Sequence, residues 1–201
     1  MPRWWLVGML IVSQRSRKAC GEHGDRLNPQ VFWCPVWGDG QKVTNWNRVD
    51  KQESARKAIS GVMLWERALW LAEFIDKYGG VFILEHPANA TSWGRPSSQH
   101  LLQKTNVGLS RFDMCMFGLC TKVKRDPILK ATKFASNSVY TNRLFGGARC
   151  DGTHHHVNCQ GYEGGEMRSV HAQRYPGKLC QKISELVGLV VEPVPVELVE
   201  C

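Results

Sequence analysis

No hydrophobic segment of the sequence is long enough to cross a bilayer. The longest apolar segment, residues 4–12, has nine residues, whereas a membrane-spanning helix needs about twenty. Nine residues match the apolar part of a signal peptide, but a basic stretch follows where a small-x-small cleavage motif would stand. We therefore expect a buried first strand or edge strand here, with a signal peptide and a membrane anchor as the alternatives.

The eight cysteines include no Cys-x-x-Cys pair, which is the usual signature of a structural zinc site. Their uneven spacing does not indicate a regular disulfide framework either. Four of them, Cys115, Cys120, Cys150 and Cys159, lie in or near segments that also contain histidines. This arrangement favours reduced thiols and metal binding, and it predicts an intracellular, reducing compartment, either cytoplasm or nucleus.

Acidic residues are outnumbered by basic ones, 18 against 26, which gives a formal net charge of +8. Such an excess favours an anionic partner, because phosphates and carboxylates are attracted to the positive surface. The eight tryptophans would also suit nucleic acid, whose bases stack on aromatic rings. Composition does not separate nucleic acid from an acidic protein surface, and we take nucleic acid as the predicted partner.

The hydrophobic pattern predicts one compact α/β unit. Apolar residues recur at three- and four-residue steps over residues 51–78, which indicates a long helix, and Gly79-Gly80 would end it. Further helices are predicted at residues 97–104 and 175–187, and strands at residues 29–35, 81–84, 107–116 and 128–135. This alternation predicts a Rossmann-like domain with a mostly parallel sheet, an antiparallel finishing pair and a Cys/His-rich loop.

Three regions follow from this pattern. Residues 1–30 form an N-terminal apolar and basic segment, residues 31–187 form the α/β domain, and residues 188–201 form a C-terminal tail. Glu85 directly follows the strand at residues 81–84. We expect its carboxyl group at the end of a central parallel strand, where α/β sheets bind ligands. The alternative is a structural carboxyl group that caps a helix or pairs with an arginine.

The segment at residues 150–159 is the densest group of potential metal ligands. Cys150, His154, His156 and Cys159 offer sulfur and imidazole nitrogen, the ligands that zinc prefers. One short segment seldom surrounds zinc by itself, so a further ligand is expected from Cys115 or Cys120. The alternative is that the histidines only line a polar loop.

Short motifs spread over most of the chain, from about residue 31 to residue 183, resemble one protein group by their order and spacing. That group consists of degenerate cytosine-5 DNA methyltransferase-like proteins of phages and retroelement-like open reading frames. The motifs are Glu85-His-Pro87, Ser92-Trp93, Asp113-x-Cys115, Phe117-Gly118, Lys130-x-Thr132, Asn137, Cys150, His154-x-His156, Tyr175-Pro176 and Leu179-Cys180.

The resemblance implies a doubly wound domain that binds S-adenosylmethionine, with Glu85 as the residue that hydrogen bonds a flipped cytosine. It also implies nucleic-acid contacts in the segment around the strand at Lys130 and Lys133, and we add Arg125 and Asn137 to these candidates.

Two departures from the family pattern count against catalysis. Trp37 stands in the place of the family's cysteine nucleophile, with Cys34 three residues earlier as the candidate thiol. No strand with a Gly-rich turn precedes Val31, so the expected cofactor motif is not evident. The sequence therefore predicts a DNA-binding protein that resembles cytosine-5 methyltransferases and leaves its enzymatic activity open. The alternative is a non-catalytic, zinc-stabilised nucleic-acid-binding module.

Overall fold

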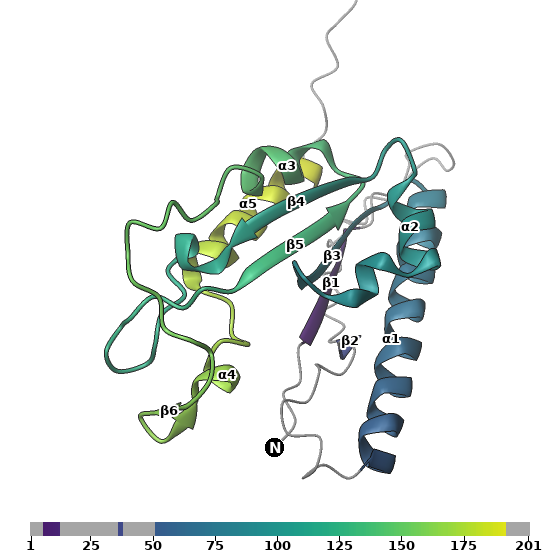
Figure 1. The fold of residues 1–201 in the computed structure, drawn as a ribbon. Helices are drawn as coiled ribbons and strands as arrows, with labels where there is room; N and C mark the ends of the chain where they lie inside the picture. Colours follow the sequence, from purple (N-terminus) through teal and green to yellow (C-terminus); the bar gives the residue numbers. More distant parts are fainter. Residues whose placement is uncertain (1–5, 13–35, 38–50, 192–201) are drawn as a thin grey trace, which may run out of the picture.

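The computed structural model describes residues 6–12, 36–37 and 51–191. The strand predicted at residues 29–35, which contains Cys34, lies outside them. Along the chain the elements are (Figure 1) β1 (Leu6–Val12), β2 (Val36–Trp37), α1 (Lys51–Lys77), β3 (Val81–Pro87), the 3-10 helix η2 (Thr91–Gly94), α2 (Pro96–Leu102), β4 (Gly108–Asp113), the 3-10 helix η3 (Met114–Phe117), β5 (Ala131–Ser136), α3 (Val139–Phe145), β6 (Tyr162–Glu163), β7 (Glu166–Met167), α4 (Arg168–His171) and α5 (Gly177–Val191).

The main sheet has the order β2-β1-β3-β5-β4, and each neighbouring pair in it is antiparallel. The prediction of a Rossmann-like, mostly parallel sheet was therefore wrong. The strand–helix–strand order behind this prediction is present, because α2 lies between β3 and β4 in the chain and both strands run in the same direction. However, β5 returns between these two strands and pairs with both. Parallel neighbours joined by a helical crossover are thus not formed by the described strands.

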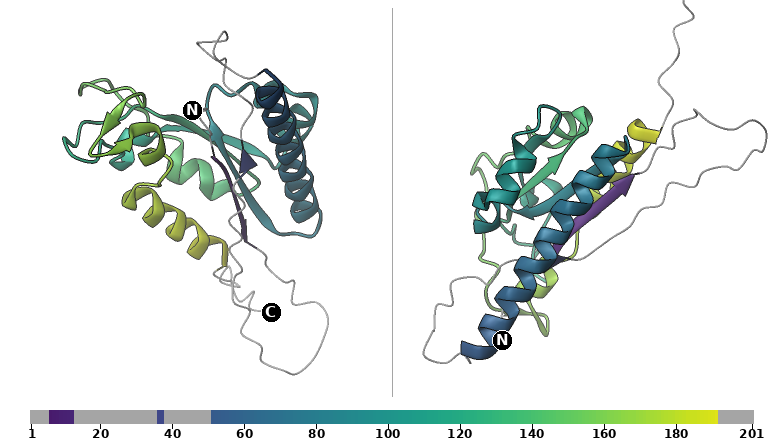
Figure 2. Two further views of the ribbon diagram at one scale, coloured as in Figure 1. Left: turned by 90° about the horizontal axis from the view of Figure 1, so that it is seen from below. Right: turned by 90° about the vertical axis from the view of Figure 1, so that its right-hand side faces the viewer.

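Helices cover both faces of this sheet. Figures 1 and 2 show α1 and α2 on one face, with α3 and α5 on the other. Alternate residues of β3 serve the two layers: Phe82 and Leu84 pack with Trp65 of α1, whereas Ile83 packs with Leu179 of α5. A strand buried on both faces reads as a continuous apolar run in the sequence, as the segment before Glu85 does.

Several predicted elements are confirmed. The first strand is present as β1, and the long helix is present as α1, which ends at Lys77. Gly79 has a left-handed φ of 72°, Gly79 N–H donates to Asp76 O at 3.0 Å, and Gly80 N–H donates to Ile75 O at 2.9 Å. This is the Schellman motif, which the Gly79-Gly80 pair indicated. None of the described helices is both long and apolar enough to span a membrane.

Candidate metal centre and basic surface

Two separate segments bring the predicted metal ligands together. Cys115 lies on η3, directly after the edge strand β4, whereas Cys150, His154 and His156 lie on the loop that follows α3. Asp113 at the end of β4 fastens this loop, because its Oδ2 accepts a hydrogen bond from Cys150 N–H at 2.9 Å. The far end of the loop is held by Val157 N–H, which donates to Pro127 O at 2.9 Å.

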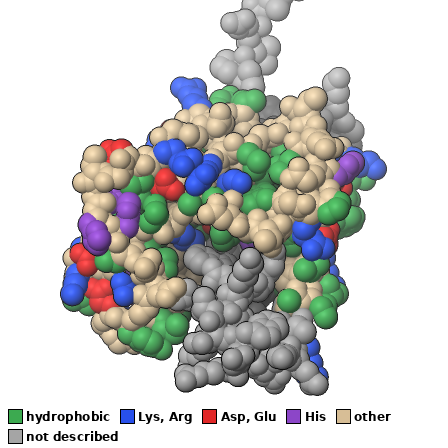
Figure 3. All heavy atoms as spheres, in the orientation of Figure 1, with side chains coloured by type: hydrophobic (Ala, Val, Ile, Leu, Met, Phe, Trp, Pro, Cys, Tyr) green, Lys and Arg blue, Asp and Glu red, His purple; other side chains and the backbone are tan. Residues whose placement is uncertain are grey.

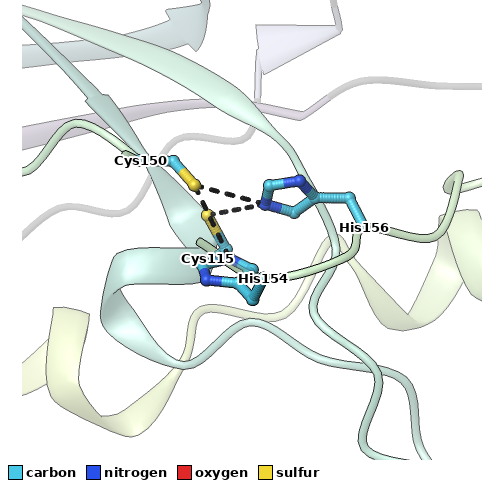
Figure 4. A group of neighbouring side chains, drawn as sticks. All are labelled: Cys115, Cys150, His154 and His156. Atoms are coloured by element: carbon cyan, nitrogen blue, oxygen red, sulfur yellow. Dashed lines mark hydrogen bonds between the residues drawn. The ribbon is translucent and has the colours of Figure 1, made fainter. Parts of the chain in front are cut away.

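The four ligand atoms lie within 4.8 Å of one another, and Figure 4 shows their side chains pointing toward a common centre. Cys150 Sγ is 3.6 Å from His154 Nε2 and 3.4 Å from His156 Nε2, and His156 Nε2 is 3.4 Å from Cys115 Sγ. Tetrahedral zinc, with bonds of about 2.3 Å to sulfur and about 2.0 Å to nitrogen, separates these atoms by about 3.6 Å. The group could therefore hold a metal ion.

The electrostatics of Cys115 also suit a cation. Burial raises the pKa of Cys115 to about 12, and the hydrogen bond with Cys150 and the nearby charges of Cys150 and Asp113 act in the same direction. Each of these influences opposes a second negative charge at this place. A bound divalent cation would reverse that balance, because it stabilises the thiolate form directly.

Cys159 and Cys120 do not join this group. Cys159 is half-buried and packs against the core cluster that contains Phe112 and Phe134. The backbone carbonyl of Cys120 accepts a hydrogen bond from His171 Nε2 at 3.0 Å. Of the five predicted ligands, the structure thus brings together Cys115, Cys150, His154 and His156, and leaves Cys159 apart.

Glu85 lies in the middle strand of the sheet, with 3% of its surface exposed. The hydroxyl group of Tyr175 hydrogen bonds to its carboxyl group. Burial raises the pKa of Tyr175 well above its ordinary value, and the charge and hydrogen bond of Glu85 add to this shift. Because the neighbouring strands are antiparallel, Glu85 does not lie at a shared carboxyl edge of parallel strands. Its catalytic role stays a prediction, and that of Cys34 falls outside the described residues.

The cofactor implied by the methyltransferase resemblance does not fit the described sheet. A doubly wound domain binds its cofactor where the carboxyl ends of adjacent parallel strands meet. In the described sheet the strand directions alternate, so the carboxyl ends of neighbours lie at opposite edges. The described strands therefore do not form the kind of edge at which a doubly wound domain binds S-adenosylmethionine.

The predicted nucleic-acid contacts have different surroundings. Lys130 is buried, and its Nζ donates to Ala172 O at 3.3 Å. Asn137 joins β3 to the end of α1, because its Oδ1 accepts from Phe82 N–H at 3.1 Å and its Nδ2 donates to Gly80 O at 2.9 Å. Lys133 and Arg125 are more accessible, Lys133 on β5 and Arg125 on the turn after Thr121.

Lys133 has a basic neighbour that sequence reasoning missed. Arg111 of β4 is directly opposite Lys133 in the strand register. Figure 3 shows Lys and Arg side chains gathered on one face of the molecule, over β4 and β5. Burial and the charge of Arg111 lower the pKa of Lys133. Lys133 Nζ also lies 5.9 Å from the ring centre of Trp93. Only the strand register reveals this pair, so no sequence signal could have found it.

Comparison of the chain with protein-family models, with curated proteins and with solved structures found no match.

Proposed function

We propose that this protein is a non-catalytic, zinc-stabilised nucleic-acid-binding module. The observation that carries the proposal is the convergence of two cysteines and two histidines at distances close to those of a tetrahedral ion. Zinc is the metal that best suits mixed thiolate and imidazole ligands in this geometry. Four protein ligands are typical of a structural zinc site, since a catalytic one keeps a position open for water.

The place of the metal group supports a link to nucleic acid. Arg111 and Lys133 are like charges on directly opposite residues of an antiparallel pair, which is an unfavourable arrangement within the protein. A phosphate group between them would turn this repulsion into two attractions. Cys115 lies two residues after the end of β4, and β4 is the strand that carries Arg111. A bound metal would thus stiffen the edge of the sheet on which the basic pair lies.

The resemblance to degenerate cytosine-5 methyltransferases favours DNA as the nucleic acid. Binding is favoured over methyl transfer because the described antiparallel sheet does not fit the cofactor site that this resemblance implies. The thiolate ligands need to stay reduced, so the proposal also places the protein in a reducing intracellular compartment.

The proposal is tested on the purified full-length chain by metal analysis and by oligonucleotide binding. We expect one zinc ion per chain, and binding of labelled single- and double-stranded DNA that weakens as salt increases. The double variant Arg111→Gln, Lys133→Gln should reduce the slope of log affinity against log salt by about 1 to 2. Lys182→Gln, an exposed lysine of α5 paired with Glu185, serves as the control. Two results would overturn the proposal: a folded protein that contains no zinc, or a DNA affinity that does not change with salt concentration.

A further inference from the structure

A pocket of about 380 Å³ lies beside the start of α5, next to the turn that follows η3. This volume lies within the range of small-molecule sites. Phe117 and Leu119, both almost completely buried, form its apolar floor, and the half-buried Tyr175 and Pro176 give it an apolar wall. Its basic lining residues are Arg125, Arg174 and Lys178, together with His171, and none of the described lining residues is acidic.

Arg125 adopts a backbone conformation that its residue type disfavours. Its φ is 63°, and it is the one residue other than glycine with a positive φ in the described part of the chain. This left-handed conformation costs a residue with a Cβ atom roughly 1 kcal/mol, which glycine would avoid. Strain of this kind tends to persist where a side chain is needed for function.

Lys178 also stands at a position where a lysine destabilises the fold. It is the second residue of α5, a helix of 15 residues that has no acidic residue in its first turn. The N-terminus of a helix carries a partial positive charge, which repels a lysine and attracts an anion. In the described part of the chain neither Lys178 nor Arg125 has an ion-pair partner.

Arg174 is held in place by an acidic residue outside the pocket lining. Its Nη2 donates to Glu166 Oε1 at 2.8 Å. This ion pair balances the charge of Arg174 and fixes its guanidinium group. Arg125 and Lys178 are therefore the lining cations of the pocket that have no ion pair with another described residue. These two cations, a helix N-terminus and an apolar wall together match a small anion that carries a flat, apolar ring.

We propose that this pocket binds a nucleotide, with its phosphate group between Arg125, Lys178 and the first N–H groups of α5, and its base against Tyr175 and Pro176. The nucleotide can belong to a nucleic-acid strand or be free in solution. Binding of a nucleotide within a nucleic-acid strand rests on the proposed function of the protein, whereas binding of a free nucleotide does not.

The experiment compares the wild-type chain with Arg125→Gly, Lys178→Gln and the control Arg67→Gln, an exposed arginine of α1. Binding of a labelled single-stranded oligonucleotide and of a labelled mononucleotide is measured by fluorescence anisotropy. We expect Arg125→Gly and Lys178→Gln each to weaken binding about tenfold, and Arg67→Gln to leave it nearly unchanged. Arg125→Gly should leave the unfolding midpoint unchanged or higher, because it relieves backbone strain. Weaker binding could then not be attributed to unfolding.

The outcomes separate this inference from the proposed function. If the wild type binds the oligonucleotide and the pocket variants bind it equally well, the pocket assignment is overturned and the proposed function stands. If the wild type binds the mononucleotide alone and the pocket variants lose it, the pocket assignment stands for a free nucleotide and the proposed function fails. If the wild type binds neither ligand, both fail.

Discussion

Tyr175 and Glu85 form a hydrogen-bonded pair on the α5 side of the sheet. Their burial makes each group costly to leave without its partner, by roughly 1 to 3 kcal/mol. We therefore expect Tyr175→Phe to lower the free energy of unfolding by an amount in this range. Glu85→Gln keeps the shape of the side chain and should cost less.

A double-mutant cycle in urea checks this pair. The double variant should be more stable than the sum of the two single changes implies, by at least about 0.5 kcal/mol. Additive changes would show that the two side chains do not act together in the folded protein.

Asp76 links α1 to the segments that carry Lys104, Asn106 and Asn137. Burial alone would raise its pKa, but the hydrogen bonds from Asn137, Asn106 and Lys104 outweigh burial and hold the pKa of Asp76 below its ordinary value of 3.8. A carboxylate with a lowered pKa in the folded state stabilises the protein above its unfolded-state pKa, and this contribution is lost as the pH falls through the folded-state pKa.

The variant Asp76→Asn should therefore be less stable at neutral pH, by roughly 1 to 2 kcal/mol. Its stability should also fall less steeply than that of the wild type when the pH drops below about 4. Unfolding in urea at a series of pH values measures both effects. Glu185→Gln, which breaks an exposed ion pair with Lys182, is the matched control and should change stability by less than about 1 kcal/mol.

The β4–β5 pair carries a repulsion that a substitution can remove. Arg111 and Lys133 are directly opposite, and like charges in this position destabilise a strand pair. Arg111→Thr should raise the free energy of unfolding by about 0.2 to 1 kcal/mol, because threonine also suits a strand. The same variant should bind DNA more weakly. A variant that is less stable would show that the arginine packs favourably and is not kept for a ligand.

The positions of the longer helices and strands could be predicted from the sequence, but the pairing of the strands could not. The apolar period of α1 and its Gly79-Gly80 ending are local features, and the structure contains both. The direction of β5 depends on how the chain returns after the turn at residues 120–127, which no local pattern specifies. Helix α3 was missed because it has seven residues and begins with Val139, Tyr140 and Thr141, which are weak helix formers.

The candidate metal centre was predicted better than the fold because its ligands are chemically distinctive. Cys150, His154 and His156 are close in sequence, and Cys115 was expected to join them from another segment. The sequence could not separate Cys159 from these ligands, since that distinction depends on the direction of the loop after Val157. The structure turns Cys159 toward the apolar core instead.

A bound metal ion would connect the edge of the sheet to a long loop with few apolar side chains. Cys150→Ser and addition of a chelator should both remove the ion and lower the unfolding temperature. If free zinc exceeds its dissociation constant a thousandfold, the ion contributes about 4 kcal/mol to the free energy of unfolding. This corresponds to a change of roughly 10 °C in the unfolding temperature for a chain of this size.

Cys159→Ser is the matched control, because it replaces a nearby thiol that does not belong to the metal group. It should keep the zinc and respond to the chelator as the wild type does. Equal loss of zinc from both variants, or a chelator that leaves the unfolding temperature unchanged, would remove zinc from the account of this fold.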